Sequence, residues 1–96
     1  MMNPWPIDIG SVVISKAGRD RGRLFLVVGV VDDDFVMVAN GALRRMDRQK
    51  KKRRKHLKPT GRVVNELRER LSQVKPIEDH ELRTWLSEEE EKLVQV

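Results

Sequence analysis

The longest apolar stretch of the chain reads Leu24-Phe25-Leu26-Val27-Val28-Gly29-Val30-Val31. A strand with no polar alternation is typical of positions where protein covers both faces, as happens when a small barrel closes. Gly29 inside the run predicts a bulge or bend, the device with which small barrels turn corners. The stretch therefore predicts a buried strand of a small β-barrel.

Short apolar runs and turn signals continue the β pattern on both sides of this strand. Residues 12–14 form a β-branched run, and residues 15–22 after them resemble a turn. The three aspartates at 32–34 predict a tight polar turn into a strand at 35–39. Asn40-Gly41 then predicts a hairpin, because both residue types tolerate a positive φ.

The β pattern ends close to residue 60. We expect the returning strand of the hairpin to begin near Leu43. A last short strand is expected at residues 56–60, where Pro59 would end it at a sheet edge. Together these runs predict a barrel over about residues 7–60.

After Gly61 the apolar residues recur at helical spacing. We expect a first helix that Pro76 ends. Its apolar face would be formed by Val63, Val64, Leu67, Leu71 and Val74. A second helix is predicted from Leu82, Trp85 and Leu86, which share one face. Ser87 and Glu90 fit a capping box, so we expect a helix to restart there, with a frayed acidic end. Residues 61–96 are thus predicted to form a helical extension.

Half of the basic residues lie in one short segment. Residues 44–58, here called the basic cluster, hold ten Lys or Arg and one acid, whereas residues 77–96, the acidic tail, have a net charge of −5. Such a cluster repels itself unless it meets a polyanion, and nucleic acid is the commonest one in cells. The cluster predicts RNA or DNA binding. A solvated charged face and a nuclear address remain alternatives.

A second basic motif lies at residues 15–23, in the turn before the long apolar strand. Gly18 and Gly22 would let backbone amides approach a phosphate closely, and the cations between them would supply charge. Those cations are Lys16, Arg19, Arg21 and Arg23. The alternative is an ordinary polar loop whose glycines serve only the turn geometry.

Residues 10–41 resemble a KOW motif, with Gly22 at the place of its central glycine. The stretch ending at residues 56–60, His-Leu-Lys-Pro-Thr, is similar to the close of the fourteen-e type of large-subunit ribosomal protein in archaea and eukaryotes. The resemblance covers about residues 9–60. It implies an SH3-like barrel that binds structured RNA through its first loop and its basic strand. Transcription factors of the NusG/Spt type share the KOW motif, and the ending favours the ribosomal group.

Two features set the chain apart from the ribosomal proteins proper, namely its lysine-rich cluster and its acidic helical tail. Stand-alone KOW proteins of bacteria resemble the same group, and we place the chain with them. The expected partner is ribosomal RNA or ribosomal particles. The residues expected to bind RNA are Lys16, Gly18, Arg19, Arg21, Gly22, Arg23, Arg44, Arg45, Arg48, Lys50, Lys51, Lys52, Arg53, Arg54, Lys55 and His56.

The aromatic residues favour a reader of RNA backbone and shape. Proteins that read single strands stack bases on exposed rings. This chain has no tyrosine and four other aromatic residues. We expect Phe25 and Phe35 in the core, Trp5 over the open end of the barrel, and Trp85 docking the last helix.

Several classes of function are not expected. The chain has no cysteine, and His56 and His80 lack companion ligands, so neither a metal site nor a cofactor is predicted. No nucleophile constellation or Walker loop indicates an enzyme. No signal peptide or membrane helix is expected, because prolines interrupt the start and the longest apolar run is far shorter than about 20 residues. We expect a cytoplasmic protein.

The sequence is also compatible with two other functions. One is a transcription-associated KOW adaptor that binds polymerase or another protein. The other is an interaction scaffold that works through the acidic tail and Trp85. We also expect the acidic tail to contact the basic strand within the same chain, where it would compete with phosphate.

Overall fold

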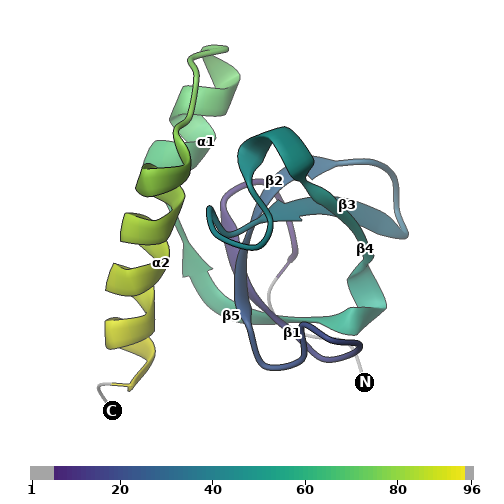
Figure 1. Ribbon diagram of the computed structural model, residues 1–96. Coiled ribbons are helices and arrows are strands. Elements are labelled where there is room, and N and C mark those ends of the chain that lie inside the picture. The colour runs from purple at the N-terminus through teal and green to yellow at the C-terminus, as the bar shows by residue number, and fades with distance from the viewer. Residues whose placement is uncertain (1–5, 95–96) are drawn as a thin grey trace.

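The computed structural model describes residues 6–94 (Figure 1). Five antiparallel strands in the order β4-β3-β2-β1-β5 curl into a small SH3-like barrel, and two helices lie along one side of it. The elements are β1 Ser11–Ser15, β2 Leu24–Val30, β3 Phe35–Ala39, β4 Lys50–Arg53, β5 Leu57–Val63, α1 Asn65–Ser72 and α2 Asp79–Val94, with short 3-10 turns η1 Met46–Arg48 and η2 Arg54–His56. The predicted class, mainly β with a helical extension, is confirmed.

Both faces of β2 are buried, as predicted, but two different neighbours cover them. Phe25 and Val27 point into the barrel, where they pack with the inward residues of β1, β3 and β5. Leu26 and Val28 point the other way and pack beneath the helices. The continuous apolar run therefore reflects one face inside the barrel and one face under the helical extension. The predicted bulge is also present, since the β2–β3 register shifts between Val27 and Gly29.

The first helix is shorter than its apolar pattern predicts. Val63 is the last residue of β5, and Val64 precedes the helix, which begins at Asn65. Leu67 is fully buried against the sheet. Val74 lies beyond the end of α1 and is 89% exposed, so its assignment to the apolar face is wrong.

Val74 instead occupies the position that ends α1. The amide of Lys75 donates to the carbonyl of Arg70 at 2.9 Å, and the amide of Val74 donates to the carbonyl of Leu71 at 3.2 Å. These two bonds form a Schellman motif, whose central residue adopts a left-handed conformation and is usually glycine. Val74 has a φ of +54°. A β-branched residue is strained there.

We expect Val74→Gly to stabilise the protein. The change relieves the left-handed strain and loses almost no packing, because the side chain is exposed. The gain is expected to be about 1 kcal/mol, which raises the melting temperature by roughly 4–8 °C in a domain of this size. Thermal unfolding measured by circular dichroism would show it. A lower melting temperature would mean that Val74 makes a stabilising contact that outweighs its strain.

The second helix contains Leu82, Trp85 and Leu86 on its buried face, as predicted. It does not restart at Ser87, since α2 is continuous from Asp79 to Val94, and its acidic end is helical rather than frayed. One reason is Glu89, which is 7% exposed and accepts a 2.7 Å hydrogen bond from Arg62 on β5. This ion pair holds the acidic part of α2 against the barrel.

The Asn40-Gly41 pair does not form a two-residue hairpin. The amides of both residues donate to the carbonyl of Arg44, and β4 begins only at Lys50. Gly41 has a φ of +77°, and a Cβ there would collide with the carbonyl oxygen of Asp79 at the start of α2. Gly41 is therefore needed because the loop passes close to the start of α2, and not because it forms a two-residue hairpin turn.

The last strand also extends further than predicted. β5 continues to Val63, so Pro59 lies within it, opposite Val13 of β1. The proline is tolerated because β5 is at the end of the strand order. Trp5 lies outside the described residues. Within residues 6–94, no helix has both the length and the apolar character needed to cross a membrane.

Candidate nucleic-acid interface

The loop between β1 and β2, residues 16–23, is here called the first loop. Two backbone bonds close it: Ser15 donates to the carbonyl of Arg23 at 3.0 Å, and Gly22 donates to the carbonyl of Ser15 at 2.8 Å. Gly18 and Gly22 have φ values of +76° and +85°, and a Cβ at either position would meet no atom within 4 Å. Both glycines are thus required for backbone conformation rather than for space. The exposed cations of the loop are Lys16, Arg19, Arg21 and Arg23.

Gly22→Val is expected to weaken RNA binding by distorting this loop. A β-branched residue at φ +85° is strained at a cost of about 1 kcal/mol or more, so the loop would change its conformation. The thermal transition of the barrel should persist, because the position is exposed. Gly29→Ala is a matched control, since Gly29 has no left-handed φ and its Cβ would make ordinary contacts. Unchanged RNA affinity in Gly22→Val would remove the loop from the interface.

The side chains of β4 alternate between two sides of the barrel wall. Lys50 and Lys52 lie opposite Val38 and Val36 of β3, which point into the barrel core. Residues directly opposite one another on antiparallel strands share a face, so these two lysines point inward. Lys51 and Arg53 point outward.

The inward lysines reach a buried polar group between β4 and the first loop. Lys52 is 8% exposed, and its Nζ donates to Ser15 Oγ at 2.6 Å. Lys50 Nζ donates to Asp20 Oδ2 at 3.2 Å, and Lys52 Nζ lies 4.0 Å from the same oxygen. Asp20 itself is 5% exposed. We call Ser15, Asp20, Lys50 and Lys52 the buried network.

The charges of the buried network shift the pKa values of its members. Burial alone would raise the pKa of Asp20, but the hydrogen bond from Lys50 and the charges of Lys50, Lys52 and Arg44 outweigh it and lower the pKa below 3.8. Burial lowers the pKa of Lys52 below 10.5, and the charge of Asp20 only partly offsets this effect. The charged carboxylate of Asp20 thus adds stability above pH 3.8, and this stability is lost as the pH falls through its folded-state pKa.

The outward cations of β4 rest on an aromatic ring. Lys51 Nζ lies 4.5 Å from the centroid of the Phe35 ring, and Arg53 Cζ lies 5.1 Å from it. In such cation–π contacts the ring attracts the cations, and the contacts restrict the side chains of Lys51 and Arg53. Phe35 is half-buried, so its placement in the core is wrong, whereas Phe25 is fully buried as predicted.

The residues of the basic cluster that follow β4 contact the first loop. The backbone carbonyl of His56, in η2, accepts a 2.8 Å bond from the amide of Lys16. Lys55 and His56 are exposed beside this contact. Arg54 is engaged elsewhere, because its guanidinium donates to the carbonyl of Ile7 at 2.5 Å and to that of Asp32 at 3.3 Å.

The residues before β4 meet the acidic tail. Asp79 Oδ1 accepts the amide of Met46 at 2.8 Å, and Asp79 Oδ2 lies 3.2 Å from Arg45 Nε. The amide of Met46 is the main cause that lowers the pKa of Asp79. The tail therefore touches the basic cluster at its beginning. Residues 77–94 of the tail do not lie along β4, which is on the side of the barrel away from α2 (Figure 1).

Neither Ser15 nor Asp20, the partners of the inward lysines, was predicted from the sequence. Asp20 is the only acid among the four cations of the first loop, which was the signal available. The structure brings the first loop together with β4 and η2. It leaves Arg45 in a separate segment, where Arg45 and Met46 contact Asp79 at the start of α2, and Arg48 is exposed in η1.

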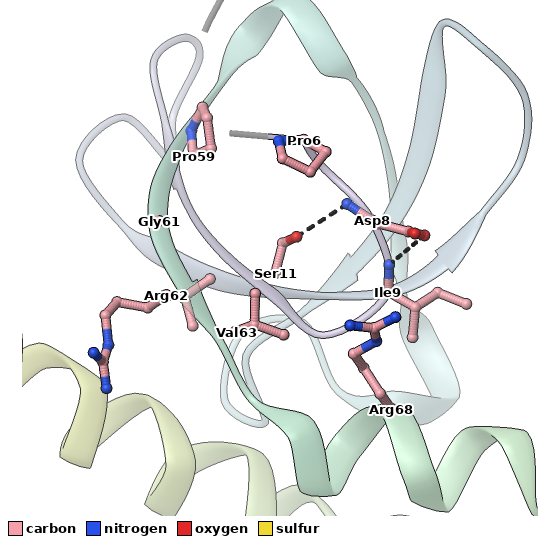
Figure 2. A pocket seen from close by; sticks show the side chains of 10 residues that line it. Pro6, Asp8, Ile9, Ser11, Pro59, Gly61, Arg62, Val63 and Arg68 are labelled. Carbon is pink, nitrogen blue, oxygen red and sulfur yellow. Dashed lines mark hydrogen bonds between the residues drawn. The ribbon is translucent and has the colours of Figure 1, made fainter. Parts of the chain in front are cut away.

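A separate hollow of about 220 Å³ lies where the N-terminal segment, the irregular β1–β5 pairing and α1 meet (Figure 2). Its polar groups largely satisfy one another: Ser11 Oγ accepts the amide of Asp8 at 3.0 Å, and an Asp8 carboxylate oxygen accepts the amide of Ile9 at 2.7 Å. The hollow is not part of the cationic surface. Across residues 6–94, no three His, Cys, Asp or Glu side chains are grouped so as to hold a metal ion.

Comparison with known proteins finds relatives among the large-subunit ribosomal proteins. No protein-family model matches the chain. Large ribosomal subunit protein eL14 of Desulfurococcus amylolyticus is 34% identical over 58 residues, which are 60% of this chain and 60% of that protein. The same protein of Pyrobaculum arsenaticum is 34% identical over 60% of this chain and 56% of its own length. That of Staphylothermus marinus is 27% identical over 62% of each.

The matched region spans about three fifths of the length of these relatives. They are named as components of the large ribosomal subunit, not as enzymes. The predicted resemblance to the fourteen-e type of large-subunit ribosomal protein, with its KOW domain, is therefore confirmed.

Proposed function

We propose that this chain binds structured RNA, and that its ligand is ribosomal RNA. The first loop and the outer face of β4 and η2 would contact the RNA backbone. The observation that carries the proposal is the junction between these two segments. The amide of Lys16 bonds to the carbonyl of His56, and Lys52 bonds to Ser15. These contacts support the proposal that two basic segments far apart in the sequence act as two sides of one surface.

The exposed side chains of this surface are suited to phosphates. Arg and Lys bind phosphate oxygens as donors and as charges, and clustered cations gain free energy by releasing counterions. The residues that we assign to direct contact are Lys16, Arg19, Arg21, Arg23, Lys51, Arg53, Lys55 and His56. Arg44, Arg45 and Arg48 would extend the surface toward α2.

The buried cations have a different role in this proposal. Lys52 is covered, and its ammonium is held by Ser15, so it joins the two sides of the surface instead of meeting phosphate. Lys50 and Arg54 are half-buried and bonded to Asp20 and to backbone carbonyls, respectively. They shape the surface and add to its positive potential.

The aromatic rings support recognition of backbone and shape rather than of single bases. Phe25 is buried, and Trp85 is 9% exposed. The ring of Phe35 is engaged by Lys51 and Arg53. Within residues 6–94, every Phe and Trp ring thus has a structural role, and a base stacked on one of them would have to displace one of these contacts.

Crosslinking in cells, followed by sequencing of the attached RNA, tests the proposal. We expect large-subunit ribosomal RNA to be enriched, and the enrichment to be lost in the variant Arg21→Gln/Lys51→Gln/Arg53→Gln. These three side chains are exposed, so the variant should fold. Sedimentation of the tagged protein gives a second readout: co-migration with ribosomal particles supports the proposal. Co-purification with polymerase, without RNA crosslinks, would support the transcription adaptor in its place.

A further inference from the structure

We propose that Asp20 is a positioning residue of the RNA-binding surface, whose buried carboxylate sets the placement of the first loop against β4. This inference rests on the proposed function. It concerns an acid at the centre of a basic surface, where any effect through charge alone would oppose binding. A positioning role therefore predicts that removing the Asp20 charge weakens RNA binding, whereas an effect of charge alone would strengthen it.

Asp20 is bonded to both sides of the surface. Its backbone carbonyl accepts the amide of Arg23 at 2.9 Å, which shapes the first loop. Its Oδ2 accepts Lys50 Nζ at 3.2 Å and lies 4.0 Å from Lys52 Nζ, both on β4. Ser15, at the start of the loop, completes the connection through its 2.6 Å bond to Lys52.

The two inward lysines require a counter-charge. Their ammonium groups point to the same side of a four-residue strand, where they repel each other and are partly removed from water. Removing one partner of such a group leaves charge that is neither solvated nor paired, and the structure rearranges to expose it. Without the carboxylate, we expect the lysines to turn toward solvent and the first loop to separate from β4.

The first loop and β4 would then no longer be held at their native separation, although the positive charge of the surface increases. Asp20→Asn raises the net charge of the chain from +5 to +6. If only charge mattered, this variant would bind RNA more tightly and with a steeper salt dependence. If Asp20 positions the loop, the variant binds more weakly, because the two sides no longer meet phosphates together.

Asp47→Asn is the matched control. Asp47 lies in the basic cluster, its side chain is 71% exposed, and its contact to Arg45 is long at 3.9 Å. The control adds the same charge without touching the buried network. We expect its affinity to equal or exceed that of the wild type.

The test measures binding to a structured ribosomal RNA fragment at several salt concentrations, with thermal unfolding of each variant. For Asp20→Asn we expect affinity about tenfold lower and a salt slope about one to two units shallower, as if one or two phosphate contacts were lost. Affinity equal to or above the wild type would overturn the inference. Absence of salt-dependent binding in the wild type would instead contradict the proposed function.

A second variant covers the case in which Asp20→Asn does not fold. Asp20→Asn/Lys52→Met keeps the inward charge at +1, as in the wild type, and places an apolar side chain at the buried position. The barrel is expected to fold, but both the hydrogen bond of Lys52 to Ser15 and its ion pair with Asp20 are absent. Affinity below the wild type supports the inference, and wild-type affinity overturns it.

Discussion

Raising the salt concentration from about 50 to 200 mM should weaken RNA binding by roughly two to three decades. The exposed cations of the first loop, β4 and η2 are sufficient to neutralise about six phosphates, which corresponds to a slope of log K against log salt of about −4 to −5. Cations rather than stacking rings supply the surface, so electrostatics should dominate the binding free energy.

Fluorescence anisotropy with a structured ribosomal RNA fragment would measure this slope. The variant Lys51→Gln/Arg53→Gln removes the two cations that rest on Phe35, and it should make the slope shallower by roughly 2. Arg68→Gln/Lys75→Gln is a control with the same change of net charge at exposed positions outside the surface. The control should keep most of the slope. A wild-type slope shallower than about −2 would exclude the surface proposed here.

The sequence predicted strand β2 well because burial of apolar side chains alone determines its pattern. The apolar run at residues 24–31 has no alternation, and the structure buries both faces of β2. What the run did not indicate was the second cover, because period and composition report that a face is buried and not what buries it. The helical extension covers this face through Leu82, Trp85 and Leu86.

Local signals failed at two residues that have another structural purpose than the one their pattern indicates. Asn40-Gly41 is a strong hairpin signal, yet the positive φ of Gly41 admits the start of α2. Val74 continues an apolar pattern, yet it is the left-handed residue that ends α1. The role of Gly41 depends on where α2 packs, which local propensity does not report. The role of Val74 is local, but a valine is an unusual residue at the left-handed position of a Schellman motif, so its type does not indicate the helix end.

The basic cluster shows the same limit for the candidate site. Charge alone predicted a polyanion partner, and nine of the ten cations in the cluster were expected to bind it. It did not separate Lys52, which is buried on Ser15, from Lys51, which is exposed on Phe35. The alternation of β4 makes this distinction, and it requires the register against β3.

Removing residues 77–96 should unfold the protein or lower its stability by several kcal/mol. Leu82 is fully buried, and Trp85 and Leu86 are 9% and 8% exposed. Burial of such side chains contributes about 1.5–3 kcal/mol each, so their sum is comparable to the total stability of a small domain, about 5–15 kcal/mol. The truncation would also expose Leu26 and Val28 of β2 to water.

The matched variant for this experiment is Glu88→Gln/Glu90→Gln/Glu91→Gln, which removes three exposed charges of α2 and keeps its apolar face. It should retain the cooperative thermal transition that the truncation loses, as measured by circular dichroism and urea unfolding. It also tests whether the tail competes with phosphate, since neutral glutamines should then raise affinity for random RNA. A truncated protein that unfolds cooperatively at the wild-type midpoint would show that the barrel is stable without α2. The tail would then be a charged appendage and not the outer layer of the core.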